Sequence, residues 1–163
     1  MAELAYIGLG ANLAQPARQL RLALHALAAL PGSKLLGASS LYHSAPMGPQ
    51  DQPDYVNAVA ALETELEPLA LLDALQAIER QQGRVRKRRW GERTLDLDLL
   101  LYAGREIDHP RLTLPHPGLT QRPFVLAPLC ELAPALTLPG GGCPHRHLAE
   151  LPAGGLRRAG PAL

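Results

Sequence analysis

The segment TLDLDLLLY, residues 94–102, alternates aspartate with leucine before it becomes wholly apolar. Side chains two residues apart on a β-strand point to the same face, about 6.6 Å apart along the chain. Asp96 and Asp98 would therefore lie side by side on one face. The opposite, core-facing side would be filled by Leu95, Leu97, Leu99 and Leu101. Because carboxylates beside such a run are costly to bury without a partner, the segment predicts a strand with a functional acidic pair.

Two carboxylates at this spacing suit one or two hard cations such as Mg²⁺. A DxD pattern alone is more often a hydrated pair on a solvent-facing strand, and the pattern by itself does not exclude that alternative. The residues just before the pair change the balance, because seven of the 16 lysines and arginines fall between positions 80 and 93. Guanidinium groups bind phosphate oxygens well, so the combination favours chemistry on a magnesium-bound nucleotide.

The basic segment has other interpretations. It can be a solvated charge run or a nucleic-acid patch, and Trp90 within it can anchor the loop or cover a flat base. The formal net charge of only +1 favours a small anionic ligand over a long nucleic acid. A small RNA-binding domain would leave Asp96 and Asp98 unexplained. No Walker A sequence occurs, and the glycines of GLGANL near Gly8 suggest a tight strand end rather than a phosphate cradle.

Length and composition indicate one compact domain. The chain has 163 residues, 47% of them hydrophobic, which is enough for a proper core. Cys130 and Cys143 form no CxxC motif and are interpreted as ordinary thiols in a reducing compartment. The first residues do not resemble a signal peptide, and no apolar run reaches membrane-spanning length. We expect a soluble, cytoplasmic protein.

The hydrophobic pattern predicts alternating strands and helices. Strands are expected at 4–10, 34–46, 54–64 and 94–102, and helices at 16–32 and 67–83. This β-α-β-β-α-β order is that of a ferredoxin-like α+β fold. It predicts a mostly antiparallel sheet with two helices on one face. A C-terminal helical extension can cover the other face.

The C-terminal third gives weaker signals. We expect a small edge strand at 104–107, a short helix at 122–134 broken by Pro128, and a final strand at 135–139. The single domain, 1–163, would have its core at about 3–151 and a disordered tail at 152–163.

Three blocks in order carry a family resemblance: GPQDQPDYVNAV (48–59), RWGERTLDLDLL (89–100) and LTLPHPGL (112–119), the last followed by Arg122. From about Ala5 to about Leu151 the chain resembles the 6-hydroxymethyl-7,8-dihydropterin pyrophosphokinases of folate biosynthesis. The resemblance implies transfer of the β,γ-diphosphate of ATP to the pterin hydroxymethyl group, with release of AMP. It also implies small-molecule substrates only, no nucleic-acid or membrane partner, and a monomer.

The resemblance assigns roles to individual residues. Asp96 and Asp98 match ligands of two Mg²⁺ ions and, with Arg84 and Arg93, form the expected catalytic set. Positions matching contacts to ATP are Gln76, Glu79, Arg84, Arg86, Arg89, Trp90, Arg93, Leu99, Arg111, Leu112, Thr113, His116 and Arg122. Positions matching contacts to the pterin are Ser44, Ala45, Met47, Gly48, Tyr55, Asn57, Trp90, Asp96 and Phe124.

Some positions depart from the family pattern. The basic loop is one residue shorter than its common form, so Arg88 and Arg89 compete for one position, and we favour Arg89. Ala45 stands where proline is frequent, and Pro117 where an aromatic residue can occur.

His116, held rigid between two prolines, can donate to a phosphate or cap a turn. A different magnesium-dependent nucleotidyl- or phosphotransferase remains the alternative enzyme.

Overall fold

The computed structural model describes most of the chain. The described residues are 2–12, 15–45, 54–82, 95–139, 141–151 and 156–162. Its N-terminal elements are β1 (Glu3–Ala11), α1 (Pro16–Ala28), β2 (Ser33–Ala38), β3 (Ser40–Ser44), β4 (Tyr55–Thr64), α2 (Pro68–Gln81) and β5 (Asp96–Tyr102). The C-terminal elements are β6 (Ile107–His109), β7 (Leu112–Leu114), the 3₁₀ turn η1 (Leu119–Gln121), α3 (Pro123–Leu132), α4 (Pro144–Ala149) and β8 (Arg157–Pro161).

The main sheet confirms the predicted α+β, ferredoxin-like fold. Its strand order is β5-β1-β4-β3-β8, with β2 also paired to β4, and all these pairs are antiparallel. The strand predicted at 34–46 is two strands, because the ladder breaks at Ser39. There the Ser39 hydroxyl accepts the backbone N–H of Val59 at 3.0 Å. None of the described helices has both the length and the apolar character needed to cross a membrane.

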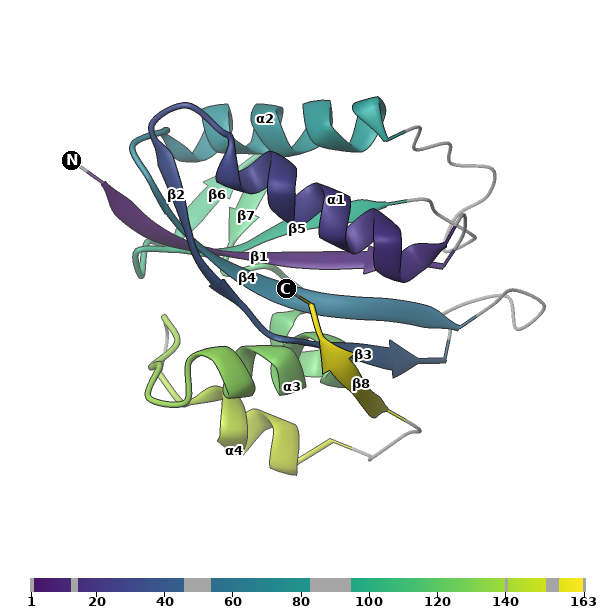
Figure 1. Cartoon of the computed structure of the whole chain (residues 1–163). Coiled ribbons are helices and arrows are strands. Elements are labelled where there is room, and N and C mark those ends of the chain that lie inside the picture. Colours follow the sequence, from purple (N-terminus) through teal and green to yellow (C-terminus); the bar gives the residue numbers. More distant parts are fainter. Residues whose placement is uncertain are drawn as a thin grey trace.

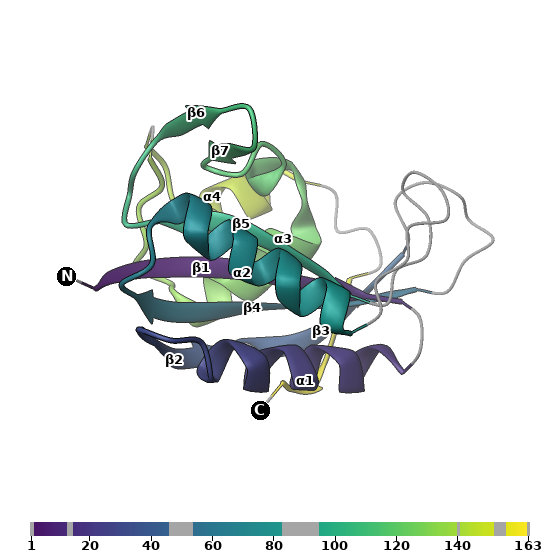
Figure 2. The same ribbon diagram turned by 90° about the horizontal axis from the view of Figure 1, so that it is seen from above.

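The helices cover the two faces of the sheet in pairs (Figures 1 and 2), with α1 and α2 on one face and α3 and α4 on the other. Helix α1 turns an apolar stripe toward the sheet, since Leu20, Leu24 and Leu27 are fully buried. In α2, Leu71 and Leu75 are likewise buried in the same core cluster. Burial of these leucine stripes against the sheet stabilises both helices beyond their intrinsic propensity.

Strand β5 follows the predicted alternation only over its first half. Leu95, Leu97 and Leu99 face the α1–α2 core, as expected. Leu101 instead joins Leu100 in the core under α3, so its predicted orientation is wrong. The cause is a β-bulge: Tyr6 pairs with Leu101 and Ile7 with Leu99, which leaves Leu100 as an extra residue.

The C-terminal third differs most from expectation. Helix α3 continues through Pro128 rather than breaking there, and the proline is buried with the apolar face of the helix. The strand expected at 104–107 begins at Ile107 and belongs to the β6–β7 hairpin. No strand forms at 135–139, and the edge of the sheet is taken by β8, within the tail expected to be disordered. The expectation of disorder is thus contradicted for Arg157–Pro161.

Glu131 on α3 ties β3 and β8 to the helix layer. It accepts the hydroxyl of Tyr42 at 2.7 Å and both the N–H and the hydroxyl of Ser40 at 2.9 Å. Arg158 of β8 completes the cluster at 3.4 Å. Burial raises the pKa of Glu131, but the hydrogen bonds and the Arg158 charge outweigh it and hold the pKa below its usual 4.5.

We expect Glu131→Gln to lower the free energy of unfolding by about 1–3 kcal/mol. The substitution replaces one carboxylate oxygen with an N–H₂ group, which would face the hydrogen-bond donors of Tyr42 and Ser40. Urea unfolding at pH 7 measures this loss, with exposed Glu63→Gln as the matched control. Since the folded pKa is depressed, the charge contribution is present above about pH 4.5 and disappears as the pH falls through the folded pKa. Equal unfolding midpoints for both variants would contradict the role of the cluster.

Candidate functional site

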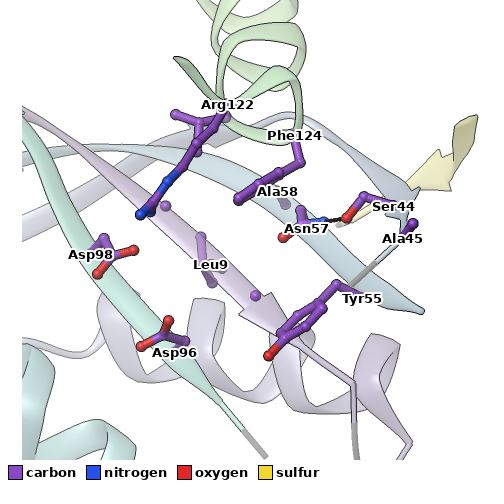
Figure 3. Close-up of a pocket in the computed structure, with 13 residues that line it drawn as sticks. Leu9, Ser44, Ala45, Tyr55, Asn57, Ala58, Asp96, Asp98, Arg122 and Phe124 are labelled. Atoms are coloured by element: carbon purple, nitrogen blue, oxygen red, sulfur yellow. Dashed lines mark hydrogen bonds between the residues drawn. The ribbon is translucent and has the colours of Figure 1, made fainter. Parts of the chain in front are cut away.

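A pocket opens on the α3 face of the sheet, where β1, β4 and β5 pass beneath the start of α3 (Figure 3). Its volume is about 640 Å³ including the space open to solvent. Its lining residues are Gly8, Leu9, Gly10, Ser44, Ala45, Tyr55, Asn57, Ala58, Asp96, Asp98, Arg122, Phe124 and Val125.

Two glycines of β1 hollow out the floor of this pocket. Gly8 and Gly10 lie within the strand, not at its end as the sequence suggested, and they share a face with Tyr6. A Cβ at Gly8 would stand 3.4 Å from the side chain of Leu100, and one at Gly10 would stand 3.1 Å from Asn57 Oδ1. The absence of side chains at both positions therefore leaves room for a ligand against the backbone.

One end of the pocket is built for a flat, polar ring. Tyr55 at the start of β4 and Phe124 at the start of α3 lie on opposite sides of it (Figure 3). Between them Asn57, only 4% exposed, donates from Nδ2 to Ser44 Oγ at 2.7 Å. Two aromatic side chains can stack on a heterocycle, and the buried amide between them can hydrogen-bond to polar groups on the edge of the ring.

The other end is acidic. Asp96 and Asp98 project from β5 into the pocket, as their spacing predicted, while Leu97 between them is buried on the core side. The side chain of Asp98 is 36% exposed. The guanidinium group of Arg122 points toward Asp98 and lies 5.9 Å from the Phe124 ring centroid.

His116 lies beside Asp98, with Nε2 3.8 Å from Asp98 Oδ1. Its Nδ1 accepts the backbone N–H of Gly118 at 3.1 Å, which places the proton of the neutral ring on Nε2, facing the carboxylate. Burial lowers the pKa of His116, and the charge of Arg122 lowers it further, while Asp96 opposes both. The ring is therefore neutral at pH 7 and can donate from Nε2.

Glu79 of α2 supports the acidic strand from the other side of the sheet. Its side chain is 7% exposed, and Oε2 accepts the N–H of Leu97 at 2.8 Å. This bond fixes the backbone between the two aspartates. It does so on β5, which lies at one end of the strand order of the main sheet. The family resemblance assigns an ATP contact to Glu79. In the structure, its side chain is hydrogen-bonded to the backbone of β5.

The remaining residues expected to contact ATP fall into two groups, one polar and one buried in the core. Arg111 pairs with Asp73 and donates to Gln76 Oε1 at 3.4 Å, so these residues meet on the outside of α2. Thr113 is exposed on β7. The side chains of Leu99 and Leu112 are buried in the core at 2% and 7% exposure.

The structure thus brings eight of the expected residues into one pocket: Ser44, Ala45, Tyr55, Asn57, Asp96, Asp98, Arg122 and Phe124. The expected residues that lie outside the described part of the chain are Met47, Gly48, Arg84, Arg86, Arg89, Trp90 and Arg93. Five lining residues were missed: Gly8, Leu9, Gly10, Ala58 and Val125. A G-x-G pattern inside a predicted strand was the available signal for the two glycines.

The acidic end fits a cation that is shared with a ligand. Among the described residues, no group of three or more histidine, cysteine or acidic side chains gathers to hold a metal. Mg²⁺ is commonly held by one or two carboxylates, with water and substrate phosphates completing its shell. Asp96 and Asp98 offer such a pair of oxygen donors in a pocket with room for phosphate.

Comparisons with known proteins agree on one family. A family model described as 7,8-dihydro-6-hydroxymethylpterin-pyrophosphokinase (HPPK) matches residues 6–134. A 2-amino-4-hydroxy-6-hydroxymethyldihydropteridine pyrophosphokinase from Haemophilus influenzae is 60% identical over 135 residues, covering 83% of this chain and 84% of that protein. A protein of the same name from Pseudomonas aeruginosa is 56% identical over 151 residues, covering 93% of this chain and 91% of that protein.

A solved structure supports the fold alone. The crystal structure of wild-type Plasmodium falciparum HPPK-DHPS matches with a TM-score of 0.69 at 14% identity. The match covers 92% of this chain and 45% of that longer chain.

We expect the imidazole of His116 to titrate below its usual 6.5 in the folded protein. Arg122→Gln should raise this pKa, because it removes a nearby positive charge, and Asp96→Asn should lower it further. NMR titration of the His116 ring signal measures both shifts, with the other five histidines as internal references. Shifts of the opposite sign would contradict the arrangement of charges around the ring.

Proposed function

The chain belongs to the 7,8-dihydro-6-hydroxymethylpterin-pyrophosphokinase family, and we propose that it transfers diphosphate from ATP to the hydroxymethyl group of 6-hydroxymethyl-7,8-dihydropterin. The products are AMP and the pterin diphosphate, and the reaction is a step of folate biosynthesis. One observation carries the proposal: a slot for a flat polar ring and an acidic pair open into the same pocket. A heterocycle bound in the slot would present its substituent to phosphate groups bound near the carboxylates.

The pterin occupies the end of the pocket between Tyr55 and Phe124. Stacking between aromatic faces contributes apolar burial and excludes water from the ring. The amide of Asn57 supplies a donor and an acceptor to the ring edge. The short segment at Ser44 and Ala45 closes the slot, and Met47 and Gly48 are proposed to extend it.

Asp96 and Asp98 would hold two Mg²⁺ ions together with the triphosphate of ATP. When bound, magnesium neutralises phosphate charge and makes phosphorus more susceptible to attack. The hydroxymethyl oxygen attacks the β-phosphorus and a new P–O bond forms, while the hydroxyl proton is released. The bond between that phosphorus and the oxygen bridging to the α-phosphate breaks, so AMP leaves.

The residues facing the acidic pair position the polyphosphate. Arg122 and the Nε2–H of neutral His116 donate to phosphate oxygens from the side of Asp98. Arg84 and Arg93 complete the proposed catalytic set. Other proposed ATP contacts are Gln76, Glu79, Arg86, Arg89, Trp90, Leu99, Arg111, Leu112 and Thr113. The arginine and histidine donors among these residues stabilise charge as it develops on the transferred group.

We propose that residues 1–163 form one domain that works as a monomer in the cytoplasm, where ATP is available. The outer strand β8 reads Arg-Arg-Ala-Gly-Pro, and charge, glycine and proline discourage pairing with a second sheet edge. The substrates are small molecules, without a nucleic-acid or membrane partner.

Incubation with ATP, Mg²⁺ and 6-hydroxymethyl-7,8-dihydropterin should produce AMP and pterin diphosphate in equal amounts, because the leaving group is AMP. Chromatography with phosphorus NMR measures the products. Formation of ADP and a pterin monophosphate would contradict diphosphate transfer and favour an ordinary phosphotransferase.

Asp98→Asn should lower kcat/KM by at least about 100-fold, because it removes a charge that faces the transferred phosphates. Titration with Mg²⁺ should show a weaker dependence on the ion than in the parent enzyme. Asp108→Asn, on the exposed side of β6, is the matched control and should retain parent activity. Activity of Asp98→Asn within tenfold of the parent would contradict the proposed role of the pair.

A further inference from the structure

The buried amide of Asn57 is held from two sides by residues of other strands. On β3, Ser44 Oγ receives its Nδ2–H at 2.7 Å, and Ser44 is only 8% exposed. On β1, Gly10 is the register partner of Asn57, and a Cβ there would stand 3.1 Å from Oδ1. The oxygen thus lies on the Gly10 side of the amide, and the nitrogen on the Ser44 side.

We infer that Ser44 and Gly10 are positioning residues that fix which way the Asn57 amide faces, and thereby select the hydrogen-bonding pattern of the ring that binds. This inference rests on the proposed function. A hydroxyl could serve either orientation of an amide, so Ser44 alone would not decide. The close Gly10 side favours oxygen, because a Cα–H can contact an oxygen acceptor but would oppose an N–H₂ group.

The fixed amide has a definite chemical preference. One hydrogen of Nδ2 is used by Ser44, which leaves Oδ1 as an acceptor and the second hydrogen as a donor. Figure 3 shows the oxygen turned away from Ser44 and toward the pocket. This pair matches a lactam edge, a ring N–H beside a ring carbonyl, and mismatches a ring nitrogen beside an amino group. Reversal of the amide would reverse the preference.

Gly10 also has to remain without a side chain for this arrangement. A Cβ at 3.1 Å from Oδ1 is closer than ordinary contact, so the amide would have to move. The same Cβ would meet the Tyr55 ring only at 3.9 Å, an ordinary distance. The main effect of a methyl group at Gly10 is therefore on Asn57.

The test compares two probes, 6-hydroxymethylpterin and 2,4-diamino-6-hydroxymethylpteridine, in which the lactam is replaced by the reversed pattern. Dissociation constants are measured by fluorescence with Mg²⁺ and a nonhydrolysable ATP analogue. We expect Ser44→Ala to reduce the preference for the lactam probe about tenfold, the effect of one hydrogen bond. Ser44→Thr, which keeps the hydroxyl, should restore the parent preference. An unchanged preference in Ser44→Ala would overturn the role of Ser44.

A double-mutant cycle separates an action through Asn57 from a general effect on the fold. Steady-state kcat/KM for the dihydropterin is measured for Ser44→Ala and Gly10→Ala, each in the parent and in the Asn57→Ala background. Each should reduce kcat/KM about tenfold in the parent, mainly through KM, and change little once Asn57 is absent. Equal losses in both backgrounds would overturn the inference, because Gly10→Ala would then act by filling the pocket and Ser44→Ala by loosening the strand.

Two control variants match the substitutions outside the pocket. Ser33→Ala removes a strand hydroxyl that bonds Thr64, and Gly37→Ala adds a methyl group with ordinary clearance from Leu132. Both should leave the preference between the probes unchanged, and thermal unfolding reports the loss of stability in every variant. Absence of diphosphate transfer by the parent chain would refute the proposed function. Transfer with an unchanged probe preference in Ser44→Ala would refute only this inference.

Discussion

The arrangement of the site depends on the burial of one face of β5. Leu95, Leu97 and Leu99 are packed between the sheet and the α1–α2 layer, and a shift by one residue would turn all of them to the pocket face. Because side chains alternate across a strand, the same register turns Asp96 and Asp98 toward the pocket. The hydrophobic effect on one face of the strand thus fixes the position of the charges on the other.

Two further features preserve this register where it would otherwise weaken. The strand lies at the end of the sheet order, and Glu79 supplies an acceptor for the Leu97 N–H from the neighbouring helix. The bulge at Leu100 then ends the alternation and directs Leu100 and Leu101 into the core beneath α3. The acidic pair therefore occupies the regular half of β5, and the irregular half contributes to the second core.

The sequence was informative where local periodicity decides the structure, as for the leucine stripes and the acidic pair. It failed where the outcome depends on partners distant in the chain. The bulge arises from pairing with β1, and β8 is held by pairing with β3 and by Arg158 against Glu131. The contact of Ser44 with Asn57 likewise depends on how β3 and β4 align, which no local pattern reveals.

The two ends of the pocket differ in how much of their structure exists before a ligand binds. At the ring end, Ser44 and Asn57 are buried and hydrogen-bonded to each other, so little reorganisation is needed to receive a heterocycle. At the acidic end, the side chain of Asp98 is 36% exposed, and covering it with an anionic ligand would be costly without added positive charge. A cation supplies that positive charge, and it also compensates the negative charge of a polyphosphate bound beside the carboxylates. The ring end therefore determines which molecule binds, while the acidic end is completed by the charges that its ligands bring.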